Sequence, residues 1–249
     1  MRNNQNPQNL ISDAIQSLSS LLTQRITSSN NKLQKTAVTL AYWIKDYVRL
    51  LNKEITAPST YRRYERGCVV SVHLGFRIGH EEGGLHYAIV IDKYDTTRNS
   101  VLTVLPLTSL KDNVDPNHLY FKNLFIGSEI TDAIYNKINR SFDSLTIELD
   151  QLSNELEQLE NAPERDMLKI CEYKKRLKHI DTNRLLASKQ LDKLTKMKSG
   201  SIVLVDQIVT VSKLRIYDPC SSKDMLYGIK IGNETMNKID EKIKQLYIY

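Results

Sequence analysis

Leucine and isoleucine recur every three or four residues through two long, adjacent stretches, and this repeat constrains the fold more than any other feature. The first stretch runs from Leu145 to Leu159 and the second from Ile170 to Leu194, with the short segment "NAPERD" between them. Such a repeat predicts amphipathic helices whose apolar stripes meet in a coiled coil. Because the break is short, we expect the helices to fold back as an antiparallel hairpin. Pro163 suits the first turn of the second helix, where no backbone N–H is needed.

Charge divides the same two stretches, within a chain whose net charge is +6. Residues 143–161 contain six acids and no base, whereas residues 164–198 contain eleven Lys/Arg against five Asp/Glu. In a hairpin the acidic helix would face the basic helix, and each exposed ion pair contributes roughly a few tenths of a kcal/mol. The surplus of cations leaves a second interpretation open, in which the outer basic face contacts RNA.

The flanking segments predict an α+β fold. Residues 1–60 are expected to form an N-terminal helical hairpin, and residues 61–249 a β-domain that the coiled coil interrupts at about 128–198. The apolar stripe of the first N-terminal helix consists of Ile11, Ile15, Leu18 and Leu22. That of the second consists of Leu33, Ala37, Leu40, Ile44, Tyr47 and Leu51. A closing helix is expected after Asn233, which is suited to its N-cap.

Short segments rich in valine and isoleucine predict the strands of the β-domain. They are "GCVVSVHL", "HYAIVIDKY", "VLTVLPLTS", "HLYFKNLF" and "GSIVLVDQIVTVS", separated by turn residues. Five or more short strands at close spacing are typical of a small barrel or curled sheet.

Several classes of protein do not fit the sequence. The chain has no run of about 18 apolar residues, and its first residues lack the pattern of a signal peptide, so we expect a cytoplasmic protein without a membrane span. Three widely spaced cysteines, Cys68, Cys171 and Cys220, favour neither a disulfide framework nor a zinc site. Phosphate-binding loops, dinucleotide fingerprints and serine nucleophile elbows are missing, so we expect no cofactor and no metal.

Four blocks, taken in order, resemble the MazF/PemK family of toxin ribonucleases. They are "RGCVVSVHL", "GHEEGGLHYAIVI", "VLPLTS" and "VDQIVTVSKLRI", and with the closing helix they cover about a third of the chain. The resemblance implies a small SH3-like β-barrel of the MazF/PemK/CcdB type that forms a homodimer and is held by a cognate antitoxin protein. It further implies metal-independent cleavage of single-stranded RNA, including mRNA, through attack of the ribose 2′-OH on the neighbouring phosphate.

The same resemblance implies four catalytic residues, which are His80, His86, Thr108 and Asp206. His86 stands where many members carry a catalytic Arg, and Leu204 stands where others carry theirs. Two imidazoles suit the base and acid roles of this reaction, and an imidazolium supplies positive charge for the phosphate. Asp206 would orient whichever histidine is near it. Residues expected to bind substrate are Arg77, Glu81, Ser109, Gln207, Lys213 and Arg215.

Two other functions remain open from the sequence. The same barrel occurs in toxins that bind a topoisomerase and catalyse nothing, and these would use the closing helix rather than the histidines. The third possibility is an RNA-binding protein without turnover, which would keep salt-sensitive affinity for RNA.

Overall fold

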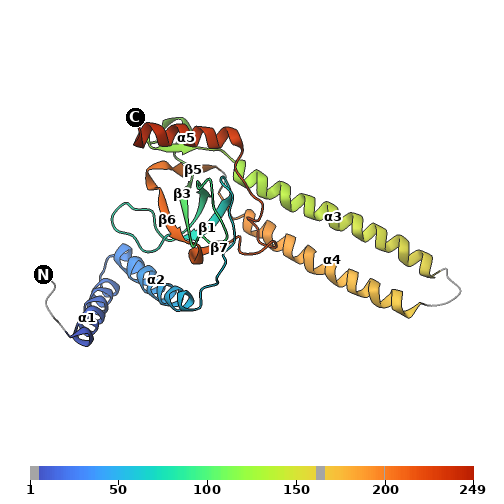
Figure 1. Cartoon of the computed structure of the whole chain (residues 1–249), viewed down its shortest axis with the longest axis horizontal. Helices are drawn as coiled ribbons and strands as arrows, with labels where there is room; N and C mark the ends of the chain where they lie inside the picture. Colours follow the sequence, from blue (N-terminus) through green and yellow to red (C-terminus); the bar gives the residue numbers. More distant parts are fainter. Residues whose placement is uncertain (1–5, 161–165, 199) are drawn as a thin grey trace.

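The computed structural model describes residues 6–160, 166–198 and 200–249, and within them it contains five α-helices and seven β-strands (Figure 1). The helices are α1 (Pro7–Ile26), α2 (Asn31–Ile55), α3 (Glu129–Glu160), α4 (Met167–Leu194) and α5 (Asn233–Tyr247). The strands are β1 (Val69–His73), β2 (Leu85–Val90), β3 (Val101–Ser109), β4 (Asn123–Phe125), β5 (Ser201–Leu204), β6 (Val209–Ser212) and β7 (Ile216–Asp218). The predicted α+β class is confirmed.

The strands form one antiparallel sheet in the order β4-β5-β3-β2-β1-β7, and β6 also pairs with β3. The long central strand β3 has three partners, because its first half pairs with β6, its middle with β2 and its end with β5. Among the described residues no pairing joins β7 to β4 or β6, so the sheet is open.

Both faces of the sheet are buried. Val70 and Val72 of β1 pack into one apolar cluster with Tyr64, whereas Val69 packs with Ile89 on the other face. Alternation along the strand produces this division, since successive side chains point to opposite faces. The near-continuous apolar runs of the sequence follow from this two-sided burial.

Helices α3 and α5 cover the second face. Ile130, Ile134 and Ile138, spaced by four residues at the start of α3, are buried in the main core, so the base of the α3–α4 hairpin belongs to the β-domain. The carboxylate of Glu129 accepts hydrogen bonds from the N–H of Gly232 at 2.6 Å and the hydroxyl of Thr235 at 2.7 Å. These contacts cap α5.

The closing helix therefore differs in one detail from the prediction. Its N-cap residue is Gly232 and not Asn233, which is the first helical residue. Glycine has no side chain to accept a helix N–H, and Glu129 of α3 instead binds the N–H of Gly232 and the hydroxyl of Thr235.

Helices α3 and α4 fold back on each other and project from the sheet, as predicted (Figure 1). Leu145, Leu152 and Ile180 form a cluster of their own along the hairpin. Leu149 and Leu177 of the predicted stripes are exposed, because each helix has a single neighbour and the edge of its stripe stays open to water. Helix α4 begins after the N-cap Asp166, and the predicted opening at Pro163 lies outside the described residues.

An ion pair within the described residues joins the acidic helix to the basic helix, as the charge pattern predicts. Arg176 of α4 lies 2.6 Å from the carboxylate of Glu155 of α3.

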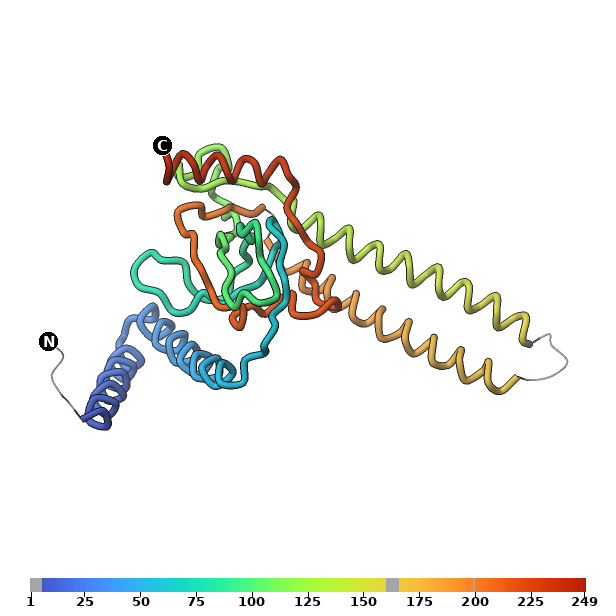
Figure 2. The backbone as a smooth tube through the Cα atoms, in the orientation of Figure 1, coloured from blue at the N-terminus to red at the C-terminus, as the bar shows by residue number. Residues whose placement is uncertain are grey.

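The two N-terminal helices are present but are packed unequally. In Figure 2 they diverge from the turn that joins them, and α1 has no buried residue. Ile11 and Ile15 are exposed, so the packing predicted for that half of the stripe is wrong. Helix α2, in contrast, buries Ala37 and Leu50.

Candidate functional site

Backbone hydrogen bonds close the two ends of the long β1–β2 loop, residues 74–84. The N–H of Leu74 donates to the carbonyl of Gly84 at 2.7 Å, and the N–H of Gly84 donates to the carbonyl of Gly75 at 2.8 Å. A Cβ on Gly83 would lie 2.9 Å from Cγ of Arg77, and Gly84 has a φ of 85°. Both positions therefore favour glycine for steric reasons. At Gly83 a side chain would collide with Arg77, and at Gly84 the backbone is left-handed.

His86 stands at the start of β2, and both of its ring nitrogens face acceptors. Nδ1 lies 3.1 Å from the carbonyl oxygen of Leu107, and Nε2 lies 2.9 Å from that of Gly83. Nε2 also lies 3.1 Å from a carboxylate oxygen of Glu82. A neutral imidazole has one N–H, whereas the imidazolium has two and can donate to both sides. The carbonyls of Leu107 and Gly83 therefore hold the ring from both sides.

Glu82 connects His86 to the short helix η2, residues Val205–Gln207. Its backbone N–H donates to Oε1 of Gln207 at 3.3 Å. Asp206, the neighbour of Gln207, lies 3.5 Å from the ammonium group of Lys122. The carboxylate beside His86 is therefore Glu82, whereas Asp206, which was expected to orient a histidine, pairs with Lys122.

His80 and Glu81 lie at the exposed tip of the same loop. The carboxylate of Glu81 lies 4.0 Å from the guanidinium of Arg77, and its backbone N–H donates to the carbonyl of Ile78 at 3.4 Å. Among the described residues the ring of His80 has no hydrogen bond or ion pair, and it does not contact the His86–Glu82 pair. The two histidines are thus in different settings, one held and one free.

Thr108 is the last residue but one of β3 and lies close to His86. Strand alternation puts the two side chains on the same face of the sheet, that of the paired residues Val90 and Val104. The carbonyl that His86 contacts belongs to Leu107, the residue before Thr108. The structure shows no hydrogen bond between their side chains among the described residues.

Thr108 and Ser109 also line a hollow of about 550 Å³ beneath the end of α4. Its cations are Lys193, Lys196 and Lys198, and no described lining residue is acidic. Ser109 therefore belongs to a basic hollow beside the site and not to the His86–Glu82 pair.

Lys213 is a correction to the sequence-based site. Its ammonium lies 2.7 Å from the carboxylate of Asp95, and the two side chains are 2% and 1% exposed. It also donates to the backbone carbonyls of Arg62 at 3.0 Å and Thr96 at 3.1 Å. A group enclosed in this way cannot reach a substrate, so Lys213 stabilises the fold instead.

Arg77 and Arg215 come together on the other side of the loop. Nε of Arg77 donates to the carbonyl of Leu74 at 2.9 Å, and Nη1 of Arg215 lies 3.5 Å from the same oxygen. Arg215 also lies over the ring of Trp43, 5.4 Å from its centroid. The structure thus brings two predicted substrate-binding residues together with Trp43 of α2, which the sequence did not single out.

Three residues of this region were not anticipated, namely Trp43, His73 and Lys122. The rings of Trp43 and His73 are stacked with centroids 4.5 Å apart. One signal was available, because the single tryptophan of the chain lies off the predicted apolar stripe of its helix. Lys122 has no comparable signal, since only the fold brings it to Asp206.

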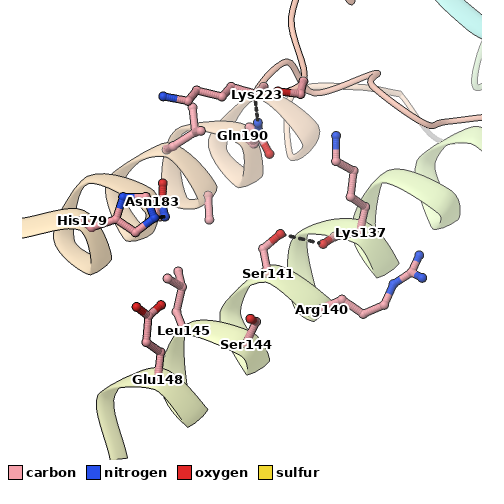
Figure 3. A pocket seen from close by; sticks show the side chains of 13 residues that line it. Lys137, Arg140, Ser141, Ser144, Leu145, Glu148, His179, Asn183, Gln190 and Lys223 are labelled. Atoms are coloured by element: carbon pink, nitrogen blue, oxygen red, sulfur yellow. Dashed lines mark hydrogen bonds between the residues drawn. The ribbon is translucent and has the colours of Figure 1, made fainter. Parts of the chain in front are cut away.

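A different cavity, of about 620 Å³, lies between α3 and α4 at the base of the hairpin (Figure 3). Two of its polar side chains, those of Lys137 and Gln190, hold the hairpin to the β-domain. Lys137 donates to the carbonyls of Asp224, Met225 and Tyr227, and the amide of Gln190 donates to the carbonyl of Lys223. None of the predicted site residues lines it.

Comparison with known proteins adds no assignment, since a scan against protein-family models finds no match and a search of curated proteins finds no relative. Within the described part of the chain, none of the helices combines the length and the apolar character needed to cross a membrane.

Proposed function

We propose that this protein is an endoribonuclease that cleaves single-stranded RNA without a metal, and that it acts as the toxin of a toxin–antitoxin system. The observation that carries the proposal is the imidazole of His86, which Glu82 and two backbone carbonyls hold beside a glycine-containing loop. The open sheet is, in this proposal, the SH3-like barrel of the MazF/PemK/CcdB type. A homodimer, a cognate antitoxin and a cytoplasmic location belong to the same proposal.

The proposed reaction moves two protons. The 2′-oxygen attacks the adjacent phosphorus, and its proton passes to the carboxylate of Glu82. The bond from phosphorus to the 5′-oxygen breaks, and the imidazolium of His86 protonates that leaving oxygen. The products are a 2′,3′-cyclic phosphate and a 5′-OH end. General acid–base catalysis of this kind typically contributes about 10²- to 10⁴-fold.

Other predicted residues take supporting roles in this proposal. Gln207 fixes Glu82 through its backbone, and Asp206 with Lys122 forms the adjacent wall. Thr108 stands beside the carbonyl that holds His86. His80 and Glu81, exposed at the loop tip, are available to contact the RNA.

The test is cleavage of a long RNA of mixed sequence, with and without EDTA, followed by mapping of the fragment ends. We expect EDTA-resistant cuts with 5′-OH ends, and a loss of about 10²-fold or more in rate for both Glu82→Gln and His86→Ala. His118→Ala is the matched control, because His118 forms a histidine–carboxylate pair with Asp115 on the exposed surface. His80→Ala distinguishes Glu82 from His80 as the general base, since loss of cleavage in this variant would assign the base role to His80.

One observation favours a second function, RNA binding without turnover. Both nitrogens of His86 already face acceptors inside the chain, so catalysis requires Nε2 to leave the carbonyl of Gly83. Intact RNA that is nevertheless bound by the folded protein would support this second function and reject the nuclease.

A further inference from the structure

A further hollow, separate from the two described above, lies between α2 and the sheet, on the side of the β1–β2 loop that faces α2. It has a volume of about 520 Å³, within the range of roughly 300–1,000 Å³ typical of ligand sites. We call it the arginine hollow, and the side chains that define it are Trp43, Tyr47, Phe76, Arg77 and Arg215. Its remaining wall is backbone and small side chains of β6 and the loop, and no described lining residue is acidic.

Two guanidinium groups converge in the arginine hollow, and the carboxylate of Glu81, 4.0 Å from Arg77, lines the neighbouring hollow instead. Arg77 and Arg215 both reach the carbonyl oxygen of Leu74, at 2.9 and 3.5 Å. Burial, and then the positive charge of Arg77, lower the pKa of Arg215 below its ordinary value. Like charges held this close repel each other, and an anion placed between them would relieve that repulsion. A phosphate suits the pair, because guanidinium groups bind phosphate oxygens in a forked geometry.

Aromatic rings line the arginine hollow beside the two guanidinium groups. Trp43 is fixed between the ring of His73 and the guanidinium of Arg215. Tyr47 lies 5.6 Å from Trp43, centroid to centroid, and is 43% exposed. Proteins that bind single-stranded nucleic acid pair a positive groove with aromatic rings on which bases stack. The arginine hollow has both parts.

A neighbouring hollow offers a contrast. It shares Trp43, Phe76 and Arg77 but is also lined by Asp46 and Glu81, and its volume is about 380 Å³. The two carboxylates make it less suitable for a phosphate. The anion site is therefore on the Arg215 side of Trp43.

We propose that the arginine hollow binds one nucleotide of a single-stranded RNA next to the bond that is cut, with its phosphate at Arg77 and Arg215 and its base against Tyr47 and Phe76. This inference rests on the proposed RNA substrate. It gives α2, which lies outside the MazF/PemK resemblance, a direct part in binding. Helix α2 then extends the substrate site instead of serving only as packing.

The test measures binding of a fluorescent single-stranded oligonucleotide whose 2′-hydroxyls are all methylated, so that it cannot be cleaved. We expect Tyr47→Ala to weaken binding by about 5- to 150-fold, as for loss of one base–aromatic stack. Arg77→Gln should reduce the slope of log K against log salt by about 0.7, the value for one phosphate contact on a single strand. The matched controls Tyr94→Ala and Arg98→Gln alter exposed residues in the turn after β2 and should bind like the wild type.

The outcomes separate this inference from the proposed nuclease. If the wild type binds the oligonucleotide and both hollow variants, still folded by circular dichroism, bind equally well, the hollow inference fails while the nuclease stands. If the hollow variants lose binding but the wild type never cuts RNA, the inference stands and the nuclease fails. No binding by the wild type would overturn the inference and make an acidic peptide the better occupant. Equal binding of a duplex would also overturn the inference, because the site would then not prefer a single strand.

Discussion

Replacing Lys213 by methionine gives the sharpest test of how the structure uses this lysine. The variant keeps an unbranched apolar stem but removes the ammonium that lies 2.7 Å from Asp95. The carboxylate would stay buried with the backbone N–H of Tyr64, at 2.8 Å, as its remaining described donor. The carbonyls of Arg62 and Thr96 would also lose their contact with the ammonium.

The expected cost follows from this burial. Removing one partner of a buried ion pair typically costs about 3–5 kcal/mol, because the other charge is left uncompensated. Lys230→Met is the matched control, since Lys230 lies 3.2 Å from Glu65 in a pair whose side chains are 46% and 63% exposed. Exposed pairs contribute about 0–1 kcal/mol. The two lysine-to-methionine changes should therefore differ by several kcal/mol.

Equilibrium unfolding in urea measures the stability of the two lysine variants. The single variant Asp95→Asn and the double variant Asp95→Asn/Lys213→Met complete a double-mutant cycle. We expect the double variant to be less destabilised than the two single variants added together, since the residues are in contact. A loss below about 1 kcal/mol for Lys213→Met, together with weaker RNA binding, would refute the reasoning. It would return Lys213 to the substrate-binding residues.

Three further predictions concern the histidine stack, the hairpin and the cap of α5. Burial lowers the pKa of His73 below its ordinary 6.5, so the unfolded chain binds more protons just below that pH, and stability should fall as pH falls. His73→Phe does not titrate, and the stability of the wild type relative to this variant should decline from about pH 7.5 to about pH 5 in urea unfolding. Leu152→Ala should cost about 2–5 kcal/mol, read from hydrogen exchange of α3 and α4, whereas the exposed Leu149→Ala should cost much less. Glu129→Gln should lower stability by about 1 kcal/mol through its capping contacts, whereas the exposed Glu234→Gln should have a smaller effect in thermal unfolding.

Local patterns predicted the elements of the fold well. The repeats around Leu152 and Ile180 indicate the hairpin, and the valine-rich segments indicate the strands, because side-chain periodicity is a property of neighbouring residues. The partners of those elements depend on residues far apart in the chain. Glu129 caps a helix that begins 104 positions later, at Asn233, and no local signal marks that contact.

The candidate site was predictable in part for the same reason. His86 and Gln207 were found through the quoted sequence blocks, and the structure ties both to Glu82. Lys213 was misassigned because a lysine after a strand ordinarily faces water, and only the fold shows Asp95 enclosed beside it. The role of Trp43 likewise appears only when α2 packs beside His73.

The most direct measurement is hydrogen exchange of the full chain with and without the 2′-O-methylated single-stranded oligonucleotide. We expect slower exchange in the β1–β2 loop, in η2 with the start of β6, and in the part of α2 around Trp43. Protection confined to the basic helix α4, or unchanged exchange everywhere at saturating oligonucleotide, would contradict this expectation.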